Sequence, residues 1–230
     1  LFDLDDTLVR YRRPPAALLR ESFDAVGVDP IFPIEAYIER FDAFAARTDS
    51  MRELRAECFA ALCSDRARDP SLGRAVADAF ADARDHRNVE LLDGAAAALD
   101  ALSERYDLAI VTNGARDAQR EKIDAAGLRS RVDTVVYAGH DAPAKPDPEP
   151  FRLALDRLAA PTSAAVHVGD SLASDVAGAS AAGLRSVLLA DESSDVADVG
   201  SGGSAPDVDP APDDVVRSLS ALVDPPWSET

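Results

Sequence analysis

Three aspartates, Asp3, Asp5 and Asp6, stand within the first six residues of the chain. The apolar residues around them predict a short buried strand, with Asp3 and Asp5 near its carboxyl end. Carboxylates this close raise one another's pKa unless a cation or a proton relieves the repulsion. Hard oxygen donors without a neighbouring His or Cys favour Mg²⁺ over zinc. The same residues also fit a polar turn with an aspartate N-cap before a helix, and this stretch alone does not decide between the two.

Polar residues also follow later strand-like segments, and they favour a shared site. They are Thr112, Asn113 and Gly114 after the apolar segment 107–112, Lys145 in the loop 140–150, and Asp170 and Asp175 after the apolar segment 164–168. In a parallel sheet the carboxyl ends of the strands meet at one edge, where ligands bind. We therefore expect these side chains to gather with Asp3 and Asp5.

Strands alternate with helices after residue 88. The periodicity predicts strands at 107–112, 134–137, 164–168 and 186–189, and helices at 94–105, 115–126, 149–159, 172–182 and 214–223. This alternation indicates an α/β fold with a parallel sheet and right-handed crossovers. The segment 190–213 is rich in Asp, Ser, Gly and Pro, and it predicts a flexible acidic loop within the core.

The segment 11–87 has helical periodicity and no strand signal. Apolar patterns predict helices around residues 16–26, 34–44, 54–62 and 76–80, with prolines and polar residues between them. Cys58 and Cys63 lie in the third of these helices and are expected to pack in a core. We therefore expect a core made of residues 1–10 and 88–230, into which residues 11–87 are inserted as a helical subdomain.

The chain carries 42 acidic and 24 basic residues among 230, a net charge of −18 at pH 7. This charge argues against nucleic acid and anionic membranes as partners, and no apolar run reaches the ~20 residues that span a bilayer. Only Lys122 and Lys145 are lysines, and this acid-rich, lysine-poor composition resembles proteins of salt-accumulating halophiles. We expect a cytoplasmic protein, monomeric or a small homo-oligomer. Because the chain starts without Met and within a strand, we also expect residues before Leu1 in the natural protein.

The ordered motifs resemble those of a known superfamily. They are D-x-D-x-T at residues 3–7, T-N-G at 112–114, K-P at 145–146 and G-D-x-x-x-x-D at 169–175. This set is similar to the four motifs of the haloacid dehalogenase-like (HAD) hydrolase superfamily, and the helical insertion is similar to its first type of cap. The resemblance covers nearly the whole chain. It implies a Rossmann-like parallel sheet core with an inserted α-helical cap, and a Mg²⁺-dependent phosphatase.

The resemblance implies catalytic roles for two of the aspartates. Asp3 is the expected nucleophile, whose carboxylate attacks phosphorus to give an aspartyl-phosphate. Asp5 is the expected general acid, which protonates the leaving oxygen and then acts as the base that activates water. By the same analogy, the carboxylates of Asp3 and Asp170 and the backbone carbonyl of Asp5 bind Mg²⁺.

Five further residues are expected to bind the phosphate or to support the site. The Thr112 hydroxyl and the backbone N–H groups at Asn113 and Gly114 suit phosphate oxygens. The Lys145 ammonium offsets the charge that the nucleophile shares with the phosphoryl group. Asp175 is expected to act through a metal-bound water or by holding Lys145 in place.

Together these residues predict a Mg²⁺-dependent phosphomonoester hydrolase that acts on a small phosphorylated metabolite. Haloacid dehalogenation needs no acid two residues after the nucleophile, so Asp5 counts against that alternative. Phosphonate hydrolysis requires a lysine in the cap, and both lysines lie outside it. A phosphomutase of the same superfamily shares all four motifs and stays open. A non-catalytic phosphometabolite-binding protein is the alternative from another class, and aspartyl-phosphate formation discriminates against it.

Overall fold

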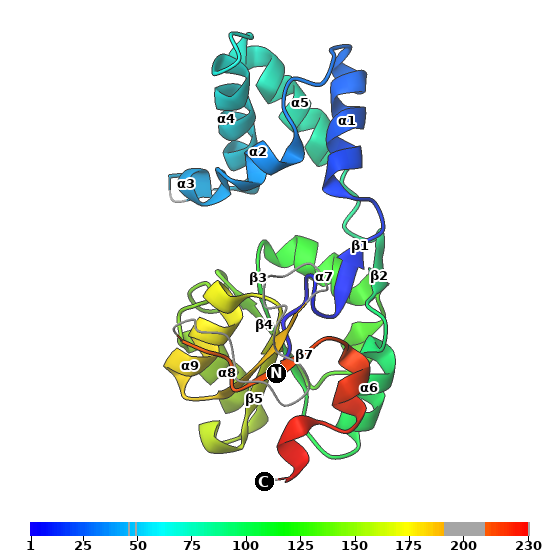
Figure 1. Ribbon diagram of the computed structural model, residues 1–230, viewed down its shortest axis with the longest axis vertical. Coiled ribbons are helices and arrows are strands. Elements are labelled where there is room, and N and C mark those ends of the chain that lie inside the picture. Colours follow the sequence, from blue (N-terminus) through cyan, green and yellow to red (C-terminus); the bar gives the residue numbers. More distant parts are fainter. Residues whose placement is uncertain (46, 49, 191–209, 230) are drawn as a thin grey trace. The chain divides into compact units, whose positions relative to one another are not determined.

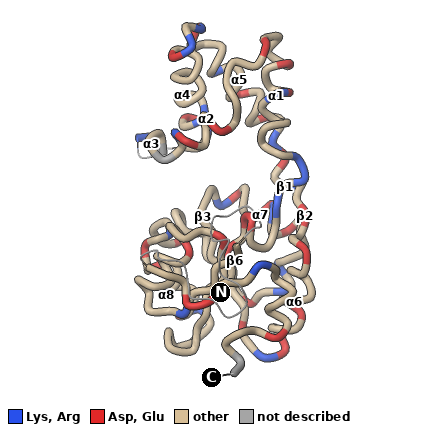
Figure 2. Tube along the Cα trace, viewed as in Figure 1, with Lys and Arg blue, Asp and Glu red and all other residues tan. Residues whose placement is uncertain are grey.

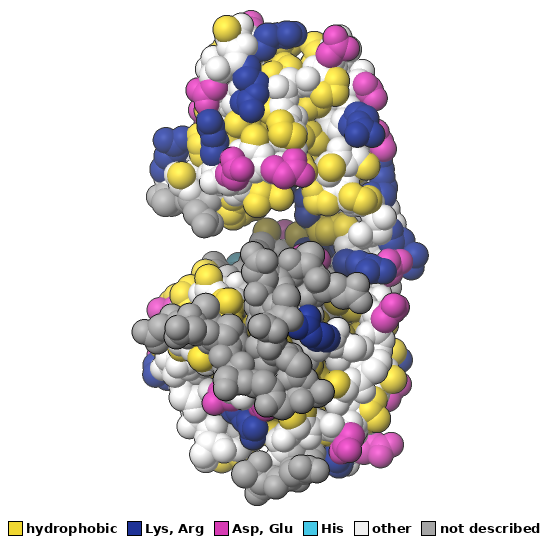
Figure 3. Space-filling model, viewed as in Figure 1, with side chains coloured by type: hydrophobic (Ala, Val, Ile, Leu, Met, Phe, Trp, Pro, Cys, Tyr) yellow, Lys and Arg dark blue, Asp and Glu magenta, His cyan; other side chains and the backbone are white. Residues whose placement is uncertain are grey.

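The computed structural model describes residues 1–45, 47–48, 50–190 and 210–229 (Figure 1). The chain divides into two compact units. We call Leu1–Arg10 with Val89–Thr230 the α/β unit, and Tyr11–Asn88 the helical unit. Acidic and basic residues occur along both units (Figure 2). On the face seen in Figure 3, the described basic and acidic side chains are interspersed.

A parallel sheet forms the centre of the α/β unit. Strand β3 (Ala109–Asn113) pairs with β4 (Thr134–Ala138), while β5 (Val166–Gly169) pairs with β6 (Arg185–Leu189), which pairs with β7 (Asp214–Val216). Phe2 forms parallel bridges to both Ile110 and Val168, which places the N-terminal segment between β3 and β5. The order across the sheet is therefore β4, β3, the N-terminal segment, β5, β6 and β7. This arrangement confirms the predicted α/β fold with a parallel sheet.

Backbone hydrogen bonds hold the first three residues in the middle of this sheet. The Phe2 N–H donates to the Ala109 carbonyl at 2.8 Å, and the Asp3 N–H donates to the Val168 carbonyl at 2.9 Å. Phe2 and Leu4 are buried on either side of Asp3. Asp3 therefore lies where a central strand reaches the carboxyl edge of the sheet.

Helices cover the sheet as the sequence predicts. They are α6 (Ala95–Ser103), α7 (Arg116–Ala125), α8 (Glu149–Leu158) and α9 (Ala177–Ala182), and α9 is preceded by one π-helical turn, η3 (Leu172–Val176). Short 3₁₀ turns complete the unit: η1 (Leu128–Ser130), η2 (Thr162–Ala164), η4 (Leu219–Val223) and η5 (Pro226–Glu229). Helix α8 buries Ala154 against Ala109, Val111 and Val136 of the sheet.

The predicted helix at 214–223 is wrong. Residues 214–216 form the edge strand β7 and residues 219–223 form the 3₁₀ turn η4. Cross-strand bonds explain the extended conformation, because Asp213 accepts from the Ser186 N–H at 2.8 Å and Arg185 pairs with Asp214 at 2.9 Å. Two valines in this stretch also favour a strand. Most of the predicted acidic loop 190–213 lies outside the described residues.

Two short strands, β1 (Val9–Tyr11) and β2 (Val89–Leu91), form a pair that the periodicity does not predict. Each is only three residues long, too short to show a repeating pattern. They stand where the chain leaves the first motif and where it returns from the helical unit.

The described residues of the helical unit form five helices. They are α1 (Pro15–Val26), α2 (Ile34–Ile38), α3 (Phe41–Ala45), α4 (Met51–Ser64) and α5 (Pro70–Ala83). The prediction of one helix across 34–44 is wrong, since α2 ends at Ile38 and α3 begins at Phe41. The ends of the other helices follow the sequence: Ser50 caps α4 by accepting from the Glu53 N–H.

Aromatic rings form the core of the helical unit. Phe59 of α4 lies edge-on to Phe32 at 5.0 Å and to Phe80 of α5 at 5.9 Å, measured between ring centroids. Cys58 and Cys63 are buried and free, which confirms their predicted place in the core. A Cβ at Gly73 would lie 2.3 Å from the Phe59 carbonyl oxygen, so α5 approaches α4 too closely for any side chain at this position. Among the described helices, none is long and apolar enough to cross a membrane.

Candidate active site

A buried lysine links two aspartates at the carboxyl edge of the sheet. Lys145 Nζ donates to Asp3 Oδ1 at 2.6 Å, to Asp175 Oδ1 at 2.6 Å and to the Val111 carbonyl at 2.9 Å. The Lys145 side chain is 1% exposed, and the two aspartates come from the N-terminal segment and from η3. The three ammonium protons are therefore all engaged, as burial of a charged lysine requires.

Asn113, at the end of β3, holds the loop that carries Lys145. Its Oδ1 accepts from the Lys145 N–H at 2.8 Å, and its Nδ2 donates to the Lys145 carbonyl at 3.0 Å. The side chain of Asn113 thus bonds to both backbone groups of one residue in the neighbouring loop. This fixes Lys145 relative to β3.

Asp175 is oriented by contacts from β5 and from its own turn. His167 lies 2.9 Å from Asp175 Oδ1 through Nε2, and the Ser171 N–H donates to Asp175 Oδ2 at 3.1 Å. A Cβ at Gly169 would come within 2.3 Å of Asp175 Cγ, so glycine makes room for the carboxylate. Of the two roles expected for Asp175, holding Lys145 is the one that a direct bond supports. His167 is buried, and it bonds to this carboxylate.

Asp170 completes a group of carboxylates that suits a metal ion. Asp3, Asp170 and Asp175 each offer an oxygen within 4.8 Å of the others. The Thr7 hydroxyl donates to Asp170 Oδ1 at 3.2 Å. Because Asp175 already accepts bonds on both oxygens, Asp3 and Asp170 are the better placed ligands. An all-oxygen donor set fits Mg²⁺.

The electrostatics of this group also call for a cation. Burial, reinforced by the Asp175 and Asp170 charges and opposed by Lys145, raises the pKa of Asp3 to about 7. Burial also raises the pKa of Asp170 to about 6, with Asp175 and Asp6 adding to the effect. The pKa of Asp175 is lowered, because the bonds from His167 and Lys145 outweigh its burial. One ammonium thus does not compensate three carboxylates, and added positive charge would be bound favourably.

The Asp5 carboxylate is held by a different pair of residues, both on α7. Lys122 Nζ lies 2.7 and 2.8 Å from its two oxygens, and Gln119 Nε2 lies 2.8 Å from Oδ2. Gln119 Nε2 also lies 2.7 Å from the Thr112 hydroxyl and 2.7 Å from the Asn113 carbonyl. The second motif is therefore tied to Asp5 through one amide.

Sequence reasoning missed Gln119, Lys122 and His167. Gln119 and Lys122 stand three residues apart, so they share one face of α7, and both are buried. The available signal for Lys122 was that the chain has only two lysines. His167 lies two residues before the end of an otherwise apolar strand, which was a weaker signal.

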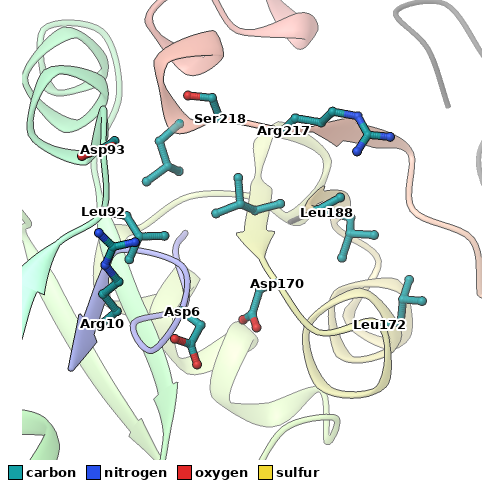
Figure 4. Close-up of a pocket in the computed structure, with 12 residues that line it drawn as sticks. Asp6, Arg10, Leu92, Asp93, Asp170, Leu172, Leu188, Arg217 and Ser218 are labelled. Atoms are coloured by element: carbon teal, nitrogen blue, oxygen red, sulfur yellow. The ribbon is translucent and has the colours of Figure 1, made fainter. Parts of the chain in front are cut away.

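A cavity of about 540 Å³ lies beside Asp170 (Figure 4). Asp6 and Asp170 line it from loops, Arg10 lines it from β1 and Arg217 from the residue after β7, with leucines between them. Its volume is within the range of small-molecule sites. The group of carboxylates that suits a metal ion therefore borders a space of ligand size.

A parallel sheet with a buried lysine and clustered carboxylates at its carboxyl edge places the chain among the α/β proteins whose ligand site lies at the carboxyl ends of the strands. The sequence model of the haloacid dehalogenase-like hydrolase family matches residues 1–183, and the chain belongs to this family. It is 32% identical to a phosphoserine phosphatase of Thermus thermophilus, over 82% of this chain and 87% of the relative. It is 34% identical to a ribulose-1,5-bisphosphate 5-phosphatase of Halopiger xanaduensis, over 82% of this chain and 83% of the relative. The chain is thus a hydrolase of the phosphatase type.

Solved structures share the fold. The HAD hydrolase YfnB of Bacillus subtilis, solved bound to magnesium, aligns with a TM-score of 0.73 and 23% identity over 96% of this chain and 94% of its own. A 2-haloacid dehalogenase of Pseudomonas syringae aligns with a TM-score of 0.62 and 28% identity, over 99% and 97% of the two chains. The Rossmann-like core with a helical insertion is therefore shared with both.

Proposed function

We propose that this protein is a Mg²⁺-dependent phosphomonoester hydrolase that works through an aspartyl-phosphate on Asp3. The observation that carries the proposal is the buried Asp3–Lys145–Asp175 group at the centre of the carboxyl edge. Lys145 leaves Asp3 one oxygen, Oδ2, with which to attack phosphorus. The bond to the leaving oxygen breaks as the Asp3–phosphorus bond forms, which divides one difficult displacement into two steps.

Positive charge and proton transfer complete the mechanism. Asp3, Asp170 and the backbone carbonyl of Asp5 would hold Mg²⁺, which supplies charge that offsets the phosphoryl oxygens. Lys145 stays protonated between two carboxylates and keeps the nucleophile oriented; its pKa is raised because Asp3 and Asp175 outweigh its burial. Asp5 donates a proton to the leaving oxygen and then accepts one from the attacking water. The contacts of Gln119 and Lys122 support this role by orienting Asp5.

Thr112 and the backbone of Asn113 are proposed to bind the phosphate oxygens that Lys145 does not reach. Thr112 is buried at the end of β3, and its hydroxyl is fixed by Gln119. The helical unit is proposed to act as the cap. The acid-rich, lysine-poor composition supports a cytoplasm of high salt as the setting.

The substrate is proposed to be a small phosphate ester, as the names of the phosphoserine and ribulose-bisphosphate phosphatase relatives suggest. The solved dehalogenase relative raises dehalogenation as an alternative. Asp5 argues against it, since departing halide needs no proton. A phosphomutase, or a protein that binds a phosphometabolite without turnover, would keep the same residues, and the following experiment separates these alternatives.

The test compares wild type with Asp3→Asn, and uses Asp6→Asn as a control that removes a charge from an exposed position of the same turn. A panel of phosphorylated metabolites is assayed for phosphate release in the presence of Mg²⁺. Mass spectrometry of the acid-quenched protein tests for an added phosphoryl group. We expect Asp3→Asn to lose turnover by several powers of ten and to carry no phosphoryl group. Asp6→Asn should retain both. Equal phosphate release by wild type and Asp3→Asn would overturn the mechanism.

A further inference from the structure

Two arginines of the helical unit lie beside one buried aromatic ring. Arg55 of α4 and Arg84, just after α5, place their guanidinium carbons 5.6 and 5.8 Å from the centroid of the Phe80 ring. Arg84 also lies 4.3 Å from the Tyr11 ring. Two positively charged side chains therefore lie beside the fully buried ring of Phe80.

Neither arginine has an acidic partner among the described residues. The Nε atoms of both are buried without a hydrogen-bond partner in the described structure. No ion pair joins either of them to a described carboxylate, whereas five other arginines of this unit form such pairs: Arg13, Arg40, Arg52, Arg74 and Arg87. The acid next to Arg84 in sequence, Asp85, pairs with Arg87.

The surroundings add further evidence of uncompensated positive charge. Burial lowers the pKa of Arg55, and the neighbouring Arg84 lowers it further, while the nearby Tyr37 hydroxyl opposes the shift. Keeping two like charges partly buried without an acid costs free energy. In a chain whose net charge is −18, acidic residues are abundant, so their absence from this group calls for an explanation.

We propose that Arg55 and Arg84 form a binding site for an oxyanion, the carboxylate or phosphate group of a small molecule. Guanidinium groups present planar donors that bind such groups in a bidentate manner. Aromatic rings beside the guanidinium groups attract them and limit their movement, which favours a preformed site. The proposal goes beyond the phosphatase chemistry, because it uses none of the residues assigned to that reaction.

The experiment measures the thermal midpoint of the full chain against inorganic phosphate, and separately against malonate, at an ionic strength held constant with KCl. EDTA is present throughout, so that the carboxylates around Asp3 repel the probe from the candidate active site. Arg55→Gln and Arg84→Gln are compared with Arg52→Gln. Arg52 lies on the same helix with an exposed side chain, and its loss removes the same charge.

We expect at least one probe to raise the midpoint of wild type and of Arg52→Gln. The probe concentration that gives half of the maximal increase in thermal midpoint should rise at least tenfold in Arg55→Gln and in Arg84→Gln. If either glutamine variant fails to fold, Arg55→Lys and Arg84→Lys take its place, with the same weakening expected from loss of the bidentate geometry. The proposal is overturned if neither probe stabilises wild type, or if the variants at 55 and 84 respond as the control does.

Discussion

The raised pKa of Asp3 makes a quantitative prediction about folding when no divalent metal is present. Burial raises this pKa to about 7, from 3.8 for an unperturbed aspartate. The folded protein therefore binds more protons than the unfolded chain between these two pH values. Its stability falls as pH rises through this window, by up to about 1.4 kcal/mol per pH unit. The loss is complete above pH 7.

Asp3→Asn mimics the protonated carboxyl and removes this dependence. By pH 5, wild type has lost stability equivalent to somewhat over one pH unit of this slope, and by pH 8 it has lost the equivalent of about three pH units. In EDTA, the stability of Asp3→Asn relative to wild type should therefore increase by about 3 kcal/mol from pH 5 to pH 8. Urea unfolding at the two pH values measures this difference.

Two comparisons separate this effect from general charge repulsion. Asp6→Asn removes the same charge from an exposed site, and its effect on this titration comes through its contribution to the raised pKa of Asp170. Its stability relative to wild type should therefore change less between pH 5 and pH 8 than that of Asp3→Asn. Adding Mg²⁺ should reduce the advantage of Asp3→Asn, because the metal stabilises the ionised Asp3 of wild type. The reasoning is refuted if Asp3→Asn gains no more than Asp6→Asn on going from pH 5 to pH 8.

Three further predictions concern the metal, the support of Asp175 and the second lysine. Asp170→Ala should raise the Mg²⁺ concentration for half-maximal activity at least tenfold while the protein stays folded in EDTA, as a Mg²⁺ titration and a melting curve will show. Gly169→Ala should lower kcat and the thermal midpoint together, because its Cβ would lie 2.3 Å from Asp175 Cγ. Lys122→Met should lower kcat more than Lys122→Arg does, because it removes the positive charge that pairs with Asp5; equal kcat for Lys122→Met and wild type would count against the role of Lys122.

The fold of the α/β unit was largely predictable because its strands and helices are long enough to show a period. Strands 107–112 and 134–137 and helices 115–126 and 149–159 agree with the structure to within two residues. The errors occur where tertiary contacts decide. Residues 214–216 become a strand through bonds to β6, and β1 with β2 are too short for periodicity to detect.

The candidate site was predictable in part, for a different reason. Asp3, Lys145, Asp170 and Asp175 follow strand ends, and a parallel sheet brings such positions to one edge whatever the details of packing. Contacts made by the helix after β3 depend on how that helix rotates on the sheet, which one sequence does not reveal. The bonds from Gln119 and Lys122 to Asp5 belong to this second kind.

The two lysines illustrate how composition and geometry bear on the same site. Every other basic residue of the chain is arginine, yet both lysines are only 5% exposed, and each bonds to one aspartate of the first motif. At Lys145 the reason is geometric: three acceptors surround Nζ within 2.9 Å, and a compact ammonium with three donors satisfies them where a planar guanidinium would not. Lysine occurs in this chain only where it is buried against Asp3 or Asp5. The lysine-poor composition resembles that of halophile proteins, and the two lysines that remain are residues of the candidate active site.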